Sequence, residues 1–231
     1  MKNRAYIFDY GGTLDTGGCH WGKVLWHAYE ERGVPVTEAQ FREAYVYAER
    51  YLGKHQLIQP DFSFRKTLEK KLELELSYLS SLTDCQLTTY VAPLLEKIYA
   101  EVVETTAHSR EVLCRLKENY PMALVSNFYG NMPVVLREFG LDGLFDSVIE
   151  SATVGIRKPD PRIFSMGVEA LKMQPSEVTV VGDSLSKDMM PARQLGCQTI
   201  WLKGEGWTDD WQDETIADRI IGDLSDLIEI Q

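Results

Sequence analysis

Apolar and polar positions follow two different patterns along the chain. Residues 4–9 form a short apolar run that ends at an Asp, which is typical of a buried strand. From about residue 20 to residue 105 the apolar positions instead recur every three or four residues, and this spacing predicts helices rather than strands. The helices predicted in this part of the chain are 21–32, 37–53, 63–81 and 83–104.

Two of these helices carry further signals. Thr37 is a residue type that caps helix N-termini, and Gln40 follows it at the spacing of a capping box. In the helix at 63–81, four leucines form one stripe, and we expect the charged residues on the opposite face. The leucines of this stripe are Leu68, Leu72, Leu76 and Leu79.

Beyond residue 109, helices and strands alternate. The predicted strands are 122–126, 147–150, 178–182, 198–202 and 219–221. The predicted helices are 109–119, 133–139, 161–171, 187–195 and a terminal one. This alternation indicates a parallel sheet covered on both faces, and the strand at 4–9 must join it because it has no other partner. We therefore expect a Rossmann-like α/β core of residues 1–16 and 105–231, with an inserted all-helical cap at 17–104.

The composition excludes several classes of function. With 44% hydrophobic and 26% charged residues, the 231-residue chain is an ordinary globular protein. The net charge of −11 repels phosphate backbones and anionic lipids, so we expect neither nucleic acid nor membrane as a partner. No apolar run is long enough for a membrane span. A small phosphorylated substrate remains compatible with this charge if a metal ion or a local Lys offsets it.

The sequence also favours a cytoplasmic location. Its start lacks the apolar stretch of a signal peptide. The four cysteines are scattered without a pairing pattern, so we expect reduced thiols. They are Cys19, Cys85, Cys114 and Cys197. The segment 204–214 is predicted to be an acidic surface loop.

Polar residues follow several of the predicted strands. Asp9 ends the first strand, Ser126 and Asn127 follow the second, and Asp183 follows the strand at 178–182. Lys158 lies in a loop just before a helix. Each residue alone is also explained by a turn, a helix cap or a solvated surface charge. Because ligands bind beyond the carboxyl ends of parallel strands, we expect these side chains to share one crevice.

The order of these residues resembles the haloacid dehalogenase-like hydrolase superfamily. That family opens with a strand ending in Asp-x-Asp-x-Thr, and residues 9–13 here read Asp-Tyr-Gly-Gly-Thr. Its second motif is matched by Ser126, its third by Lys158, and its acidic fourth motif by Asp183 and Asp188. The helical insertion occurs where the family places its cap domain. The resemblance implies a hydrolase core with a substrate-contacting cap.

The carboxylates predict a magnesium site. Mg²⁺ favours octahedral oxygen ligands, usually one or two carboxylates together with water and substrate oxygens. Asp9 and Asp183 at neighbouring strand ends supply two oxygens, and the Gly11 carbonyl is a candidate for a third. Asp188 is expected as a supporting or water-bridged partner of the metal. Mg²⁺ is therefore the expected cofactor.

The same residues predict phosphoryl chemistry. The free oxygen of Asp9 can attack phosphorus and form an aspartyl-phosphate that water later hydrolyses. Lys158 would neutralise the phosphoryl oxygens in the transition state. The groups expected to bind phosphoryl oxygens are Gly12, Thr13, Ser126, Asn127 and Lys158. The predicted function is Mg²⁺-dependent hydrolysis of a small phosphorylated metabolite.

Gly11 departs from the phosphatase pattern. Phosphatases of this family carry a second Asp at this position as general acid/base, a group that contributes about 10²–10⁴-fold to the rate. Hydrolysis of poor leaving groups should therefore be weak unless Asp15, a cap residue or water substitutes. One alternative is a pseudoenzyme that binds a phospho-ligand without turnover.

Two further alternatives come from branches of the family that lack this Asp. Phosphonatases use a cap Lys that forms a Schiff base, and the candidates here are Lys54 and Lys23. Dehalogenases use no metal, and Asp183 with Asp188 makes that alternative weak. His20, Trp21 and Lys54 are the cap residues expected to contact substrate, although packing on a cap helix explains Trp21 better.

Overall fold

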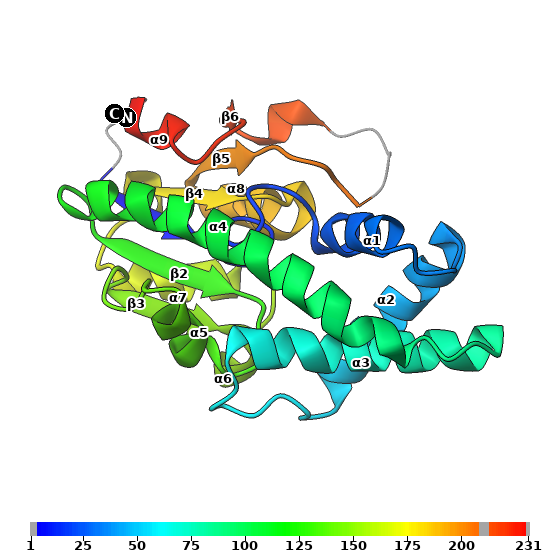
Figure 1. Ribbon diagram of the computed structural model, residues 1–231. Coiled ribbons are helices and arrows are strands. Elements are labelled where there is room, and N and C mark those ends of the chain that lie inside the picture. Colours follow the sequence, from blue (N-terminus) through cyan, green and yellow to red (C-terminus); the bar gives the residue numbers. More distant parts are fainter. Residues whose placement is uncertain (1–3, 208–212, 230–231) are drawn as a thin grey trace.

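The computed structural model describes residues 4–207 and 213–229. Its core is a six-stranded, all-parallel sheet in the order β3-β2-β1-β4-β5-β6. The strands are β1 (Ala5–Phe8), β2 (Met122–Ser126), β3 (Ser147–Glu150), β4 (Val178–Gly182), β5 (Gln198–Leu202) and β6 (Arg219–Ile221). The predicted α/β fold is confirmed, and the first strand lies at the centre of the sheet (Figure 1).

Helices surround this sheet and extend beyond one end of it (Figure 1). The helices from the first half of the chain are α1 (Trp21–Glu31), α2 (Glu38–Lys54), α3 (Phe64–Thr83) and α4 (Val91–Lys117). Those from the second half are α5 (Met132–Glu138), α6 (Ser151–Val154), α7 (Arg162–Ala170), α8 (Met190–Leu195) and α9 (Asp226–Glu229). Short turns of 3-10 helix lie at η1 (Thr88–Tyr90), η2 (Pro175–Glu177) and η4 (Glu214–Ile216). A π-helical turn, η3 (Leu185–Met189), precedes α8.

The two faces of the sheet bury different side chains. Tyr6 and Phe8 of β1 belong to an apolar cluster that continues into α4 and the helices α1–α3. Ile7 of the same strand points to the opposite cluster, which is formed mainly with α7 and α8. Strands buried on both faces are typical of parallel sheets and explain the continuous apolar run at the start of the chain.

Helices α1–α3 form an all-helical layer beside the C-terminal ends of the strands (Figure 1). Local signals fix where they begin. His20 caps α1, Ser63 caps α3, and the predicted capping box of Thr37 and Gln40 is present at the start of α2. No helix of the described residues is long and apolar enough to cross a membrane.

One helix prediction is wrong. The segments 83–104 and 109–119 were expected to be separate helices, but α4 is continuous from Val91 to Lys117. Thr106 donates a hydrogen bond to the Val102 carbonyl at 2.6 Å, and Ser109 donates to the Leu14 carbonyl at 2.8 Å. These polar residues therefore do not interrupt the helix. The expected domain boundary at residue 104 falls inside α4, and the division into core and cap remains a proposal.

The predicted surface loop at 204–214 also differs in part. Residues 208–212 lie outside the described residues. Before them, Trp207 packs on α2, with its ring centroid 4.8 Å from that of Tyr45 and 4.4 Å from the Arg42 guanidinium carbon. The Glu205 carbonyl accepts a hydrogen bond from the His20 amide at 2.9 Å. This loop therefore joins the sheet to the helical layer.

Candidate active site

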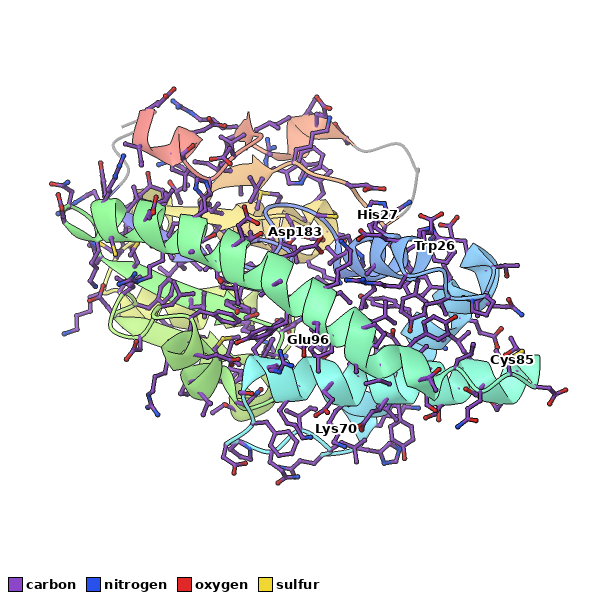
Figure 2. All side chains as sticks on the ribbon, viewed as in Figure 1. Trp26, His27, Lys70, Cys85, Glu96 and Asp183 are labelled. Carbon is purple, nitrogen blue, oxygen red and sulfur yellow. The ribbon has the colours of Figure 1, made fainter. Side chains whose placement is uncertain are left out.

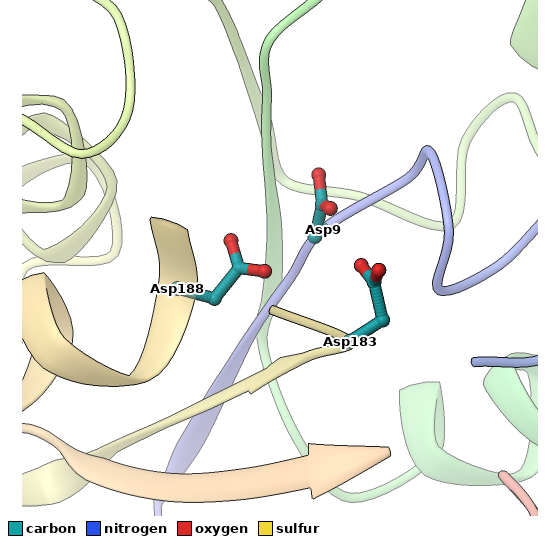
Figure 3. Close-up of side chains that lie close together, drawn as sticks. All are labelled: Asp9, Asp183 and Asp188. Carbon is teal, nitrogen blue, oxygen red and sulfur yellow. The ribbon is translucent and has the colours of Figure 1, made fainter. Parts of the chain in front are cut away.

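The side chains predicted from strand ends lie at one edge of the sheet. Asp9 directly follows β1, Ser126 ends β2, and Asp183 directly follows β4. Because β1 pairs with β2 on one side and with β4 on the other, these three strand ends are adjacent. Figure 3 shows Asp9 and Asp183 beside Asp188, which comes from the π-helical turn η3.

These residues line a pocket of about 140 Å³ between the sheet edge and the helical layer. We call its two sides the core wall and the cap wall. The core wall is centred on Asp9, Ser126, Lys158 and Asp183. The cap wall is centred on Trp21, Tyr45, Glu49 and Lys71. Ligand pockets are more often about 300–1,000 Å³, so this pocket suits a small ligand.

The centre of the core wall is a buried cluster of three carboxylates and one ammonium. Lys158 Nζ lies 2.6 Å from Asp9 Oδ1 and 2.7 Å from Asp188 Oδ1. One oxygen from each of Asp9, Asp183 and Asp188 lies within 4.8 Å of the others. Burial opposes the charge on Lys158, but Asp188 and Asp9 outweigh it and raise the pKa of Lys158 above its usual range. This lysine is therefore an ammonium at neutral pH.

The donor set of this cluster fits a hard divalent cation. Mg²⁺ prefers oxygen ligands, and three carboxylates against one ammonium leave two negative charges uncompensated within the cluster. Burial, together with Asp188 and Asp9, raises the pKa of Asp183 well above its ordinary value. Burial also raises the pKa of Asp188 to about 6, although Lys158 opposes this. A bound cation would oppose both shifts, because its positive charge favours the ionised form of each carboxylate.

Two predicted phosphate-binding residues, Asn127 and Thr13, form hydrogen bonds to other residues of the site. Asn127 donates from Nδ2 to the Lys158 carbonyl at 3.1 Å and accepts from the Lys158 amide at 2.9 Å. Its amide thus holds the Lys158 backbone, although Asn127 also lines the pocket. Thr13 is fully buried behind the pocket, and its hydroxyl donates to Asp183 Oδ1 at 3.2 Å. Thr13 therefore orients a carboxylate and does not reach the pocket.

Gly12 lines the pocket and also has a structural role. Its φ is +99°, and a Cβ at this position would lie 2.5 Å from the Asp183 carboxylate, so only Gly fits. Its amide donates to Asp15 Oδ1 at 2.7 Å instead of pointing freely at a phosphoryl group. Gly12 thus permits the close approach of Asp183 and anchors Asp15. Ser126 is buried and lines the pocket, as expected.

Asp15 and Trp21 border the space beside Gly11. Asp15 is 1% exposed, and its second oxygen accepts from Trp21 Nε1 at 3.1 Å. Burial raises the pKa of Asp15 to about 7, while the hydrogen bonds from Gly12 and Trp21 oppose the shift. A Cβ at Gly11 would lie 3.8 Å from Trp21 Nε1, which is ordinary contact. Position 11 therefore has room for a small side chain next to the indole.

The cap residues nominated from sequence fall into two groups. His20 and Trp21 line the pocket. Burial, with Lys187 and Lys71, lowers the pKa of His20 to about 4, so its imidazole is neutral at pH 7. The expectation that Lys54 contacts substrate at this pocket must be corrected. Lys54 ends α2 and lines a separate hollow away from Asp9.

Lys23 is not at the pocket either. Its ammonium lies 3.5 Å from Glu205.

Sequence reasoning missed the charged pair of the cap wall. Lys71 of α3 lies 2.5 Å from Glu49 of α2, and both line the pocket. The charges of α3 were expected on the solvent face, and this holds for Lys70, which lies on the outer side of the helix (Figure 2). Lys71 follows Leu68 by three positions, so it shares the leucine stripe. That spacing is the signal that places Lys71 inward.

Comparison with known proteins agrees with this geometry. The chain matches the family model of haloacid dehalogenase-like hydrolases over residues 3–196. It is 30% identical to haloacid dehalogenase-like hydrolase domain-containing protein 3 of Mus musculus, over 99% of this chain and 93% of that protein. It is 33% identical to a glyceraldehyde 3-phosphate phosphatase of Pyrococcus furiosus, over 53% of this chain and only about half, 52%, of that relative. A phosphoserine phosphatase of Thermus thermophilus is 28% identical over 61% of this chain and 66% of that protein.

Solved structures share the fold. A HAD phosphatase from Thermococcus onnurineus superimposes with a TM-score of 0.54 at 23% identity, covering 98% of this chain and 97% of that one. A 2-haloacid dehalogenase from Pseudomonas syringae gives 0.52 at 21% identity, covering 99% and 97%. Since both identities are low, these likenesses speak for the fold alone. With its strand-end carboxylates, its Lys158 and its match to the family model, the chain belongs to the haloacid dehalogenase-like hydrolases.

Proposed function

We propose that this hydrolase cleaves small phosphoric monoesters, with Asp9 as the nucleophile and Mg²⁺ as the cofactor. The observation that carries the proposal is the placement of Asp9 between an ammonium and two further carboxylates at the floor of a small pocket. Relatives named as glyceraldehyde 3-phosphate phosphatase and phosphoserine phosphatase support phosphate esters as the substrate class.

The metal would be held by Asp9, Asp183 and the Gly11 carbonyl, with Asp188 in support. When bound, Mg²⁺ would offset the negative charge that the phosphoryl oxygens bring to this acidic cluster. Lys158 contributes from the protein side. It contacts Asp9 and Asp188 and is buried, so its charge is felt at short range.

Asp9 attacks phosphorus through the oxygen that Lys158 does not hold. The new bond joins this oxygen to phosphorus, and the ester bond to the leaving oxygen breaks with its electron pair staying on that oxygen. Water then hydrolyses the aspartyl-phosphate and returns Asp9 to its carboxylate form. Lys158 stabilises the phosphoryl oxygens during both steps, while Asn127 keeps the Lys158 backbone in place.

Protonation of the leaving group is the weak step. Asp15 lines the pocket and has a pKa of about 7, but both of its oxygens accept N–H hydrogen bonds. These bonds stabilise its carboxylate form and fix it to the loop. Leaving groups that need no proton, such as nitrophenolate or acetate, should therefore react much faster than alkoxides.

The phosphonatase alternative requires a neutral cap amine as nucleophile. The cap lysine that lines the pocket is Lys71, and burial opposes its charge. Glu49 outweighs this effect and raises the pKa of Lys71 above its usual range. An ammonium cannot form a Schiff base until it loses a proton, so this pair disfavours that chemistry.

Turnover of acetyl phosphate and p-nitrophenyl phosphate, with Mg²⁺ and with a chelator, tests the proposal. We expect hydrolysis only with Mg²⁺ and none in Asp9→Asn. Activity in Asp9→Asn would overturn the role of Asp9. Tight phosphate binding without any turnover would favour the pseudoenzyme.

A further inference from the structure

The cap wall contains a site shaped for a cation, and Lys71 fills it. The Lys71 ammonium lies 4.5 Å from the ring centroid of Tyr45 and 5.9 Å from that of Trp21. Glu49 Oε1 lies 2.5 Å from the same nitrogen. Aromatic faces together with a carboxylate are the surroundings that bind ammonium ligands. Because the protein's own lysine occupies this site, a cationic substrate group would meet a like charge there.

Lys71 retains hydrogen-bonding capacity toward the pocket. An ammonium has three N–H donors, and Glu49 takes one of them. The face of Tyr45 attracts the charge but supplies no oxygen acceptor. Lys71 also lines the pocket, so a ligand can reach it. Among the residues that the structure describes, Lys71 Nζ has no second oxygen acceptor besides Glu49.

The charges around Lys71 favour an anionic partner. Glu49 Oε1 also accepts from the Tyr129 hydroxyl at 3.3 Å, so this oxygen is shared between two donors. Lys187 of the core wall also lines the pocket and helps to lower the pKa of Glu49. Behind Lys71, burial raises the pKa of Glu75 to about 7, so this carboxyl is only partly ionised near neutrality. The ammonium groups of Lys71 and Lys187 thus face the fully ionised carboxylate of Glu49.

The distance between this site and the nucleophile loop is short. Trp21 borders the space beside Gly11, with its Nε1 3.8 Å from where a Cβ would be, and its ring lies 5.9 Å from the Lys71 nitrogen. The indole of Trp21 therefore separates the Lys71 ammonium from the loop at Gly11. The pocket volume of about 140 Å³ likewise requires a short ligand.

We propose that Lys71 selects phosphoric monoesters whose short leaving group carries a carboxylate. This inference rests on the proposed phosphoesterase function and deepens it. The phosphoryl group would lie at the core wall, and the carboxylate would accept a hydrogen bond from Lys71 at the cap wall. Lys71 is thus a specificity-determining residue, since it contacts the part of the substrate that leaves.

Three substrates of similar size test the selection. Phosphoglycolate ends in a carboxylate, hydroxyethyl phosphate in a hydroxyl, and phosphoethanolamine in an ammonium. We expect kcat/KM with Mg²⁺ to fall in that order. The variant Glu49→Gln/Lys71→Met removes both charges and leaves no unpaired ion. In it, kcat/KM for phosphoglycolate should fall about 10- to 100-fold, as for the loss of one hydrogen bond to a charged group, while hydroxyethyl phosphate changes little.

Matched controls separate this role from folding. Lys70→Met makes the same replacement on the outer face and should leave all three substrates unchanged. Lys71→Arg keeps the charge and should retain the carboxylate preference. Equal losses for all three substrates, or a wild-type preference for phosphoethanolamine, would overturn the inference.

The proposed function can fail separately. If wild-type protein does not hydrolyse acetyl phosphate, which carries no second charged group, the phosphoesterase proposal fails. The cap site is still tested by calorimetry on Asp9→Asn, which measures binding without turnover. Phosphoglycolate should bind at least about tenfold more tightly than phosphoethanolamine, and the difference should vanish in the Asp9→Asn variant that also carries Glu49→Gln/Lys71→Met. Equal affinities in Asp9→Asn would contradict the role of Lys71.

Discussion

Each wall of the pocket buries a lysine against a carboxylate, yet the two walls differ in charge. In the core wall, Lys158 shares its ammonium between Asp9 and Asp188, and Asp183 lies beside them with no ion pair to a described residue. In the cap wall, Lys71 meets the single carboxylate of Glu49. The first arrangement has more carboxylates than ammonium groups, whereas the second pairs the Lys71 ammonium with one carboxylate and, as we propose, selects ligands by the N–H donors that remain.

The two walls also differ in how they are held. Asp9, Ser126 and Asp183 of the core wall lie at the ends of paired strands, whose register sets their positions, and Lys158 lies in the loop before α7. Cap-wall residues lie on helix faces. The segment 203–207, which follows β5 and includes Trp207, joins these helices to the sheet. Arg42 donates to the Trp207 carbonyl at 3.0 Å, and a Cβ on Gly22 would lie 1.9 Å from the Trp207 ring. These contacts of Trp207 add to the apolar cluster through which α1–α4 pack on the sheet.

The largest expected effect comes from removing the core lysine. Lys158→Met leaves the core carboxylates without their ammonium, and breaking a buried ion pair in this way costs about 3–5 kcal/mol. Urea unfolding in the presence of a chelator measures the loss, and Mg²⁺ should restore part of it. Lys71→Met is the matched change, and it should cost less because the side chain of Glu49 is 31% exposed. Equal losses would contradict the difference between the walls.

The next effect concerns the metal. Asp183→Asn replaces one carboxylate of the proposed metal site with a neutral amide and should weaken Mg²⁺ binding about 100-fold or more. Calorimetry measures the affinity directly. Asp160→Asn is a suitable control, since that carboxylate pairs with Arg162 outside the cluster. Wild-type affinity in Asp183→Asn would remove the site as described.

A third prediction concerns pH and the cap wall. Glu75 is fully buried, accepts from Tyr29 at 3.1 Å, and has a second oxygen with no partner among the described residues. Burial raises the pKa of Glu75 to about 7, although Lys71 opposes the shift while Glu49 adds to it. The folded protein therefore holds a proton that the unfolded chain releases at lower pH. Stability present at low pH is lost as the pH rises through about 7.

Glu75→Gln should abolish this loss, because Gln does not titrate and its oxygen can still accept from Tyr29. The difference from wild type should approach about 3 kcal/mol between roughly pH 5 and pH 8. Urea unfolding at both pH values provides the measurement. Parallel pH profiles for the two proteins would show that Glu75 is ionised throughout.

The smallest expected effect lies at position 11. Gly11→Asp should raise hydrolysis of alkyl phosphates by about tenfold, less than a well-placed acid supplies, because Trp21 borders the added side chain. Nitrophenyl phosphate should change little, and Gly11→Ala controls for bulk alone. In the wild type, the rate should fall steeply as the leaving-group pKa rises. Fast alkyl phosphate hydrolysis by the wild type would mean that another group donates the proton.

Most of the core wall was predictable from sequence because Asp9, Ser126 and Asp183 are tied to strand ends, whereas Lys158 lies in a loop before a helix. The alternation of strands and helices predicted the sheet, and the sheet then fixed that Asp9, Ser126 and Asp183 are neighbours. What Thr13 and Asn127 do was not predictable, because their hydrogen bonds reach residues far along the chain.

The cap wall was less predictable for a different reason. Lys71 lies three positions from Leu68, at the edge of the leucine stripe, and whether that edge is buried depends on what packs on it. Its partner Glu49 comes from another helix, and no local pattern joins the two. The continuity of α4 was missed because Thr106 and Ser109 resemble a helix end until their hydrogen bonds are known.

The role of Asp9 is tested most directly by trapping its phosphorylated form. Protein quenched in acid during turnover of acetyl phosphate with Mg²⁺ should carry a phosphoryl group on Asp9, identified by mass spectrometry of the peptide that contains it. Beryllofluoride, a phosphoryl mimic, should occupy the same carboxylate. Steady turnover with no adduct on Asp9, or an adduct on another residue, would contradict the account.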